Sequence, residues 1–122
     1  MGGSENEWSF CYDEDDFLVA ENSAFGETVC RAVSDFLDDL RPFSVDRLIA
    51  KWEEMKKHYP QEPVGVAYNA TSVDLVDGRE VIVKSLYGMF EPVRISESEF
   101  SRIVQGYRDF LRAREEGDGK GV

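Results

Sequence analysis

The chain has 122 residues, 42% of them hydrophobic, with two cysteines and a net charge of −11. This length predicts a single domain, residues 1–122, that can bury a core without a metal or a disulfide scaffold, and no apolar run reaches the roughly 18 residues of a membrane span. The charge argues against nucleic acid and anionic lipid as partners, because Lys and Arg drive both interactions, and an acidic N-terminus without a signal-peptide pattern indicates a cytosolic protein.

The first third of the chain combines short apolar runs with most of the acids. Residues 8–12 (WSFCY) and 17–20 (FLVA) are rich in aromatic and β-branched side chains, which predicts two short strands. The run DEDD between them, residues 13–16, could be the tight connection of a hairpin. Residues 1–40 hold eleven acids against a single base, Arg31, a net charge of −10. A field of that sign would attract and steer a basic protein, although acidic proteins are also common because charge keeps them soluble.

A helix is expected over residues 24–40, where apolar residues recur three and four apart in one stripe. Asn22 or Ser23 can cap its start, and Arg41-Pro42 ends it. Three acids crowd its C-terminal end: Asp35, Asp38 and Asp39. The helix dipole disfavours negative charge at that end, so local stability does not explain why they are there.

The second half of the chain predicts another helix, a sheet and a final helix. The second helix should run from 45 to about 59 with Ser44 as its N-cap. Strands are expected at 64–68 and 92–95, on either side of a hairpin. The last helix begins with the pattern SESE at 96–99, which fits a capping box.

The Asp77-Gly78 pair marks that hairpin, for which two registers compete. A two-residue loop would pair Val76 with Arg79. A three-residue loop, residues 76–78 with Gly78 left-handed, would pair Leu75 with Arg79 and gather four apolar side chains on one face: Val73, Leu75, Val81 and Val83. We favour the three-residue loop, because a slip of one residue exchanges every side chain between core and solvent.

The expected element order is β(β)ααβββ(β)α, which belongs to the α+β class. We expect an antiparallel sheet of about four to six strands with three helices packed on one face. The ordered core should span about residues 8–114, with 1–6 and 115–122 flexible because these ends lack an apolar anchor.

The acidic run could be a metal site, a catalytic acid pair or a charged binding surface. It lacks the ligand spacing and the glycine of a calcium loop, and neighbouring side chains in an extended segment point to opposite faces. A zinc site would need more than His58, Cys11 and Cys30. The motifs G-x-S-x-G, P-loop and G-x-G-x-x-G are missing, and nothing selects one carboxylate pair. We therefore expect no metal, no cofactor and no enzyme activity.

What remains is a protein-binding surface. The acids of the run and those at the end of the first helix belong to adjacent elements, so together they could form one negative patch. Trp8, Tyr12 and Phe17 could supply apolar contacts within a charged rim. The expected partner-binding residues are Trp8, Tyr12, Asp13, Glu14, Asp15, Asp16, Phe17, Asp35, Asp38 and Asp39.

The second half of the chain resembles a known group of proteins. The unit SVDLVDGREVIVKSLYGMF followed by ISESEFSRIVQGYRDFL, within residues 72–111, resembles immunity proteins of bacterial contact-dependent and other polymorphic toxin systems. The resemblance implies a protein that binds one cognate toxin domain, often a basic nuclease, and blocks its active site or substrate groove or neutralises it from elsewhere. It implies no particular contact residue, since these vary between members. The alternatives are an acidic cytosolic adaptor and a small enzyme that uses scattered carboxylates, and the oligomeric state stays open.

Overall fold

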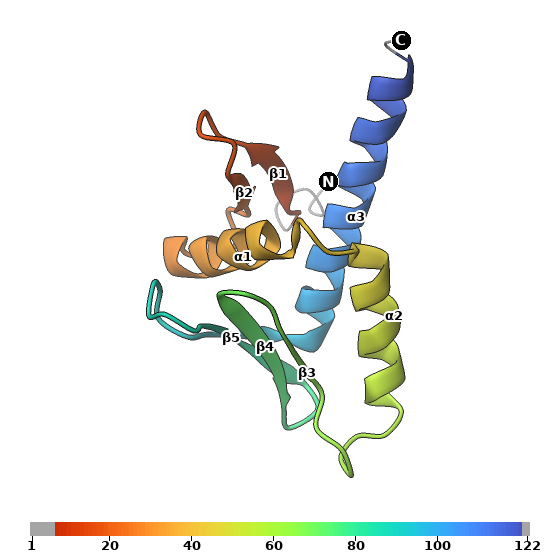
Figure 1. The fold of residues 1–122 in the computed structure, drawn as a ribbon. Coiled ribbons are helices and arrows are strands. Elements are labelled where there is room, and N and C mark those ends of the chain that lie inside the picture. Colours follow the sequence, from red (N-terminus) through yellow and green to blue (C-terminus); the bar gives the residue numbers. More distant parts are fainter. Residues whose placement is uncertain (1–6, 121–122) are drawn as a thin grey trace.

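The computed structural model describes residues 7–120, which form six strands and three helices (Figure 1). The α+β class and the element order are confirmed. In chain order the elements are β1 (Ser9–Tyr12), β2 (Leu18–Glu21), α1 (Glu27–Leu40), α2 (Val45–Lys56), β3 (Gly65–Ala67), β4 (Thr71–Val76), β5 (Glu80–Ser85), β6 (Val93–Ser96) and α3 (Glu97–Lys120).

The strands form two antiparallel sheets rather than one. β1 and β2 make a separate hairpin, and β3-β4-β5-β6 make a four-stranded sheet. α1 lies between the two, against β2 on one side and β4, β5 and β6 on the other (Figure 1). Leu18 and Ala20 of β2 are buried in the common core, and this burial holds the hairpin on the helix, away from the edges of the sheet.

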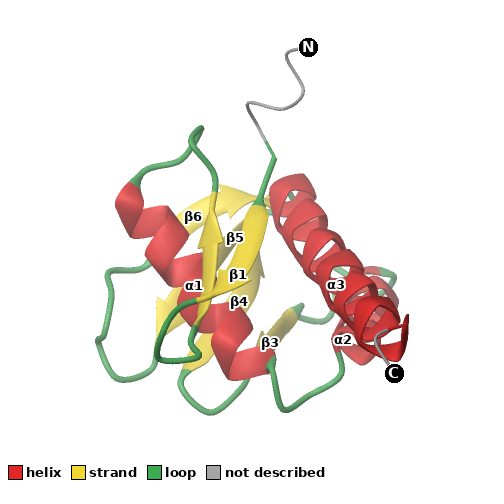
Figure 2. Cartoon of the chain, turned by 90° about the horizontal axis from the view of Figure 1, so that it is seen from above, coloured by secondary structure: helices red, strands yellow, loops and turns green. Residues whose placement is uncertain are grey.

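The other two helices complete the cover of the sheet. α3 contacts β5 and β6, and α2 packs on α3. Seen from above, α2 and α3 lie together at one side while α1 crosses the sheet (Figure 2). Among the described residues, no helix has the length and apolar character needed to cross a membrane.

α1 starts later than its apolar stripe predicts. The side chain of Asn22 accepts a hydrogen bond from the backbone of Ala24 at 2.8 Å, so it shapes a turn before the helix instead of capping it. Gly26 is the N-cap and offers no side-chain bond. The helix ends at Leu40, directly before the Arg41-Pro42 pair, as expected.

The central hairpin has the expected face but not the expected register. The loop has three residues, 77–79, so Val76 pairs with Glu80 and Leu75 with Val81, and neither predicted pairing of Arg79 occurs. Asp77 and Gly78 both have positive φ, 49° and 80°, which places both left-handed residues in the loop. The observed pairing is shifted by two residues from the predicted one, and an even shift leaves each side chain on the same face of the sheet. Val73, Val81 and Val83 are therefore buried, as predicted.

α3 begins at the predicted cap and continues beyond the predicted end. Ser96 accepts a hydrogen bond from the backbone of Glu99 at 3.0 Å. Ile95 and Phe100, on either side of this cap, are both buried, as in a hydrophobic staple. Residues 115–120, which we expected to be flexible, continue the helix, since each added residue extends a ladder of hydrogen bonds that already exists. The other expected flexible residues, 1–6 and 121–122, lie outside the described part.

Candidate protein-binding surface

The acidic run forms the turn that connects β1 to β2; we call residues 13–17 the hairpin tip. The backbone N–H of Asp13 donates to the carbonyl of Phe17, and that of Asp16 to the carbonyl of Asp13, both at 2.9 Å. The Asp13 carboxylate accepts from the backbone of Asp15 and Phe17, also at 2.9 Å. Asp16 has a φ of 66°, a left-handed conformation that Asp tolerates better than most residues. Asp13 and Asp16 are therefore needed for the turn itself.

One arginine ties the hairpin tip to the helices. The Arg41 guanidinium pairs with Asp16 at 3.3 Å and with Asp38 at 3.0 Å, and the hydrogen bond that it donates to Asp38 is the main cause that raises the pKa of Arg41. Arg41 also lies over the ring of Tyr12, 4.6 Å from its centroid, and Arg114 of α3 lies 4.7 Å from the same centroid. The tip thus has a fixed place beside α1.

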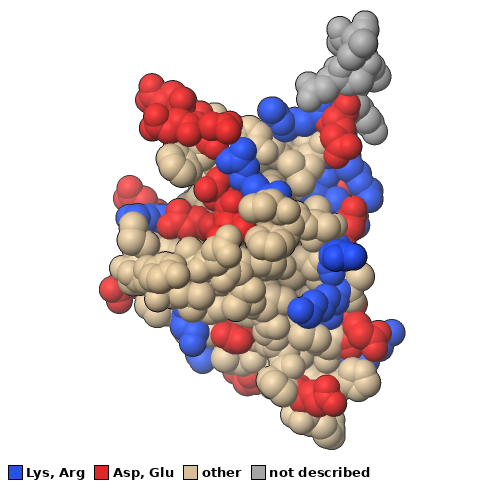
Figure 3. Space-filling view, viewed as in Figure 1, with Lys and Arg blue, Asp and Glu red and all other residues tan. Residues whose placement is uncertain are grey.

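The structure brings the two predicted groups of acids to one surface. Asp16 and Asp38 share Arg41, and a hollow of about 210 Å³ is lined by Phe17 together with the three acids at the C-terminal end of α1. On this face, acidic side chains gather over the hairpin tip and again over α1 below it (Figure 3).

Two acids of α1 make hydrogen bonds inside the protein. Asp39 accepts from the backbone N–H groups of Ala70 and Thr71 at 3.0 and 3.1 Å, and from the Thr71 hydroxyl at 2.8 Å. Asp38 accepts from the backbone of Leu18 at 3.1 Å. These bonds explain why carboxylates stand where the helix dipole disfavours them: Asp39 holds the start of β4, and Asp38 holds the start of β2.

Asp35 is more open than its neighbours. Its side chain is 41% exposed and lies 3.7 Å from Arg31, one turn earlier on α1. Partial burial raises the pKa of Asp35, and the charge of Asp38 raises it further, while Arg31 opposes both effects. A basic group from outside would relieve this repulsion.

The remaining acids of the tip are free to meet solvent. Glu14 and Asp15 are exposed, and within the described part of the chain neither side chain has a hydrogen bond or ion pair. Their charges are the ones that a partner would meet first.

Sequence reasoning missed the apolar part of this surface, the loop between β5 and β6. We call residues 86–90 (LYGMF) the apolar loop. Tyr87 is 73% exposed, Met89 59% and Leu86 50%, and Met89 and Phe90 line the same hollow as Phe17. A signal was present: five residues rich in apolar side chains stand where a strand connection was expected, and such connections are usually polar.

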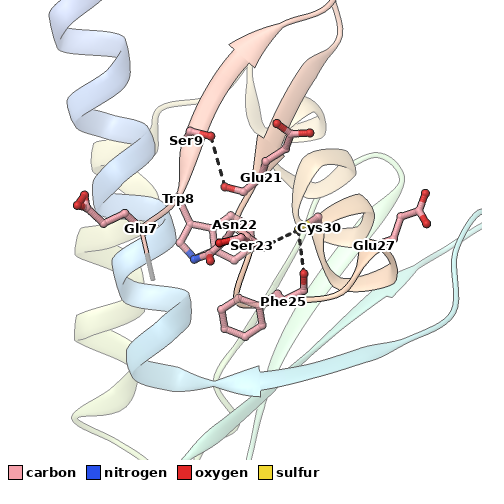
Figure 4. A pocket seen from close by; sticks show the side chains of 9 residues that line it. All are labelled: Glu7, Trp8, Ser9, Glu21, Asn22, Ser23, Phe25, Glu27 and Cys30. Atoms are coloured by element: carbon pink, nitrogen blue, oxygen red, sulfur yellow. Dashed lines mark hydrogen bonds between the residues drawn. The ribbon is translucent and has the colours of Figure 1, made fainter. Parts of the chain in front are cut away.

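Trp8 lies away from the hairpin tip. Its indole N–H donates to the Glu99 carboxylate at 2.6 Å, and its ring stacks on Phe25 with centroids 5.4 Å apart. It lines a separate open hollow of about 690 Å³ at the other end of the hairpin, with Cys30 and Glu21 among its neighbours (Figure 4). Tyr12 is half-buried between two arginines, so of the three predicted aromatics only Phe17 is exposed at the tip.

The chemistry available to a metal or a nucleophile is limited. In the described residues, no cluster of three or more His, Cys, Asp and Glu side chains is placed to hold a metal ion. α2 ends at Lys56, earlier than the predicted end near residue 59, so His58 lies in the turn after the helix, exposed and 3.5 Å from Glu54. Cys11 and Cys30 are not joined in a disulfide.

Comparison with known proteins gives no relative. No protein-family model matches the sequence, and no curated protein or solved structure is similar at the significance required.

Proposed function

We propose that this protein is a non-catalytic immunity protein that binds and neutralises a basic toxin domain through the hairpin tip and the adjoining end of α1. The observation that carries the proposal is the exposed pair Glu14 and Asp15, uncompensated by any base in the described residues and held in place by the turn and by Arg41. A toxin that acts on nucleic acid presents Lys and Arg to phosphate. Carboxylates fixed on a protruding turn can meet those groups in their place.

The expected mechanism is occupation of a basic groove without chemistry. Charges on the tip steer the partner during diffusional encounter, which raises the association rate most at low salt. The fixed turn limits the entropy lost on binding. With two unpaired thiols the protein suits a reducing compartment, and we propose that it acts in the cytosol.

The test is charge reversal at the two acids that the fold does not use. Glu14→Lys with Asp15→Lys should retain the fold and reduce the association rate about tenfold or more at low salt, with a smaller effect at high salt. The control is Glu54→Lys with Glu62→Lys, which changes the net charge equally in α2 and the connection after it, a part of the chain that lies far from the β1–β2 hairpin (Figure 1). Glu54 pairs with Lys57 and His58, but pairs this exposed contribute little to stability.

The partner is first captured from a lysate of the source organism with both variants and the unaltered protein as parallel baits, then purified for rate measurements. One basic protein that binds the control and fails to bind the tip variant supports the proposal. Several weak partners with equal loss for both variants would indicate an adaptor whose charge serves solubility. Capture of no specific partner would overturn the proposal.

A further inference from the structure

We infer that the apolar loop and Phe17 form the apolar centre of the same binding surface, and that they receive an apolar side chain which the partner carries among Lys and Arg residues. The inference rests on the proposed function and adds where the lasting contact is made.

The first reason is that the exposed apolar side chains are clustered. The described residues expose five large hydrophobic side chains, and four of them belong to the apolar loop or the hairpin tip: Phe17, Leu86, Tyr87 and Met89. Single exposed apolar residues are ordinary, whereas a group gathered from two segments about seventy residues apart indicates a contact surface. Phe17, Met89 and Phe90 line one hollow of about 210 Å³, large enough for a side chain.

The second reason is that the apolar loop is held in its shape. The Ser85 hydroxyl accepts from the backbone N–H of Tyr87 at 3.3 Å and of Met89 at 2.9 Å. The backbone of Leu86 donates to Ala70 at 2.8 Å, and Gly88 has a φ of 69° that completes the turn. A loop with these bonds presents its side chains without a large ordering cost on binding.

The charge around the hollow indicates what kind of partner it can accept. Among the residues that the structure describes, the hollow is lined by Asp35, Asp38 and Asp39 and by no base, although Arg31 and Arg41 pair with Asp35 and Asp38 from outside the lining. The hairpin tip, with the exposed Glu14 and Asp15, stands beside it. An apolar side chain of the partner enters the hollow together with the partner residues around it. Those residues must be positively charged to lie against these carboxylates. A second copy of this chain does not fit, because a net charge of −11 opposes self-association.

The two parts of the surface should therefore act at different stages of binding. Exposed acids control mainly the association rate, whereas buried apolar contacts control mainly the dissociation rate. Tyr87 with Met89 should behave as the slow-release contact, and Glu14 with Asp15 as the steering contact.

The experiment places a photo-crosslinking benzoylphenylalanine at Tyr87, at Glu14 or, as a control, at Glu62. Each purified protein is irradiated in a lysate of the source organism, and the crosslinked peptides are identified by mass spectrometry. We expect one and the same protein to crosslink from positions 87 and 14 but not from 62. The peptide joined to position 87 should contain an apolar residue flanked by Lys or Arg.

Other outcomes separate the inference from the proposed function. A crosslink from 14 alone overturns the inference and leaves the proposed function standing. Crosslinks from 87 to a second copy of this chain, or to a different protein, also overturn the inference. The absence of crosslinks from both positions overturns both.

The purified partner then gives a kinetic check. Tyr87→Ser with Met89→Ser should raise the dissociation rate about tenfold or more while the association rate changes less than about twofold. The control is Phe43→Ser, an exposed apolar residue in the connection from α1 to α2. An unchanged dissociation rate in the double variant would overturn the inference, provided circular dichroism shows the fold intact.

Discussion

Glu14 and Asp15 of the hairpin tip are like Asp38 and Asp39 of α1 in the sequence, but the two pairs do different things in the structure. Glu14 and Asp15 are exposed and unbonded within the described residues, while Asp38 and Asp39 accept hydrogen bonds from the backbone of other elements. Removing an acid that holds the fold lowers the stability of the protein, whereas removing an acid that faces a partner weakens only binding. A cluster of charges is therefore not a single site, and three substitutions on α1 can test this distinction.

The largest effect is expected at Asp39. Asp39→Ala removes the acceptor for two backbone N–H groups and a hydroxyl, so the free energy of unfolding should fall by about 2–3 kcal/mol. Urea denaturation measures the loss. Asp39→Asn is the control, because its amide oxygen can still accept and should restore part of the stability. A loss below about 0.5 kcal/mol for the alanine variant would show that Asp39 contributes as little to stability as Glu14 and Asp15 do.

An intermediate effect is expected at Asp38. Asp38→Ala removes the bond to Leu18 and one of the two ion pairs of Arg41, which should cost about 1–2 kcal/mol. It should also loosen the hairpin tip, so the backbone amides of Asp16 and Phe17 should exchange with deuterium faster than in the unaltered protein. If their exchange does not change, Arg41 holds the tip without Asp38.

The smallest effect is expected at Asp35, and its size should depend on pH. Because burial raises the pKa of Asp35, the folded protein holds this proton more tightly than the unfolded chain does. The contribution to stability is therefore present below the unfolded pKa and is lost as pH rises through the folded pKa. At pH 7 the free energy of unfolding of Asp35→Asn should equal that of the unaltered protein or exceed it by up to about 0.5 kcal/mol. Near pH 4 the two proteins should be equally stable. A loss above 1 kcal/mol at pH 7 would place Asp35 with Asp39.

Local patterns in the sequence predicted the elements well. Ser44 and Ser96 each accept the expected backbone hydrogen bond at the start of a helix, from Arg47 and Glu99. The apolar stripe of α1 and the inward face of the central hairpin are also as expected. All of these depend on residues a few positions apart, and such short-range effects can be read from one sequence.

Features that depend on distant partners could not be predicted in this way. Glu99 fits the second position of a capping box, yet its carboxylate bonds to Trp8, 91 residues away. Asp39 looked like a surface acid because Ala70 and Thr71 come near it only in the folded chain. The central loop spans 77–79, one residue later than predicted, and it includes Asp77 with a positive φ, which the sequence allows but does not require.

The bond between Trp8 and Glu99 also bears on how the protein is made. β1 and β2 are synthesised first, but the partners that fix β1 come last: Glu99 for Trp8, and Tyr107 for Phe10, whose ring centroids lie 6.1 Å apart. Contacts this far apart in the chain close late, because a long loop must be ordered before they form. On the ribosome the hairpin and α1 therefore emerge together with the bonds of Asp38 and Arg41 that hold the tip, whereas the contacts of β1 with α3 form only once α3 has been synthesised.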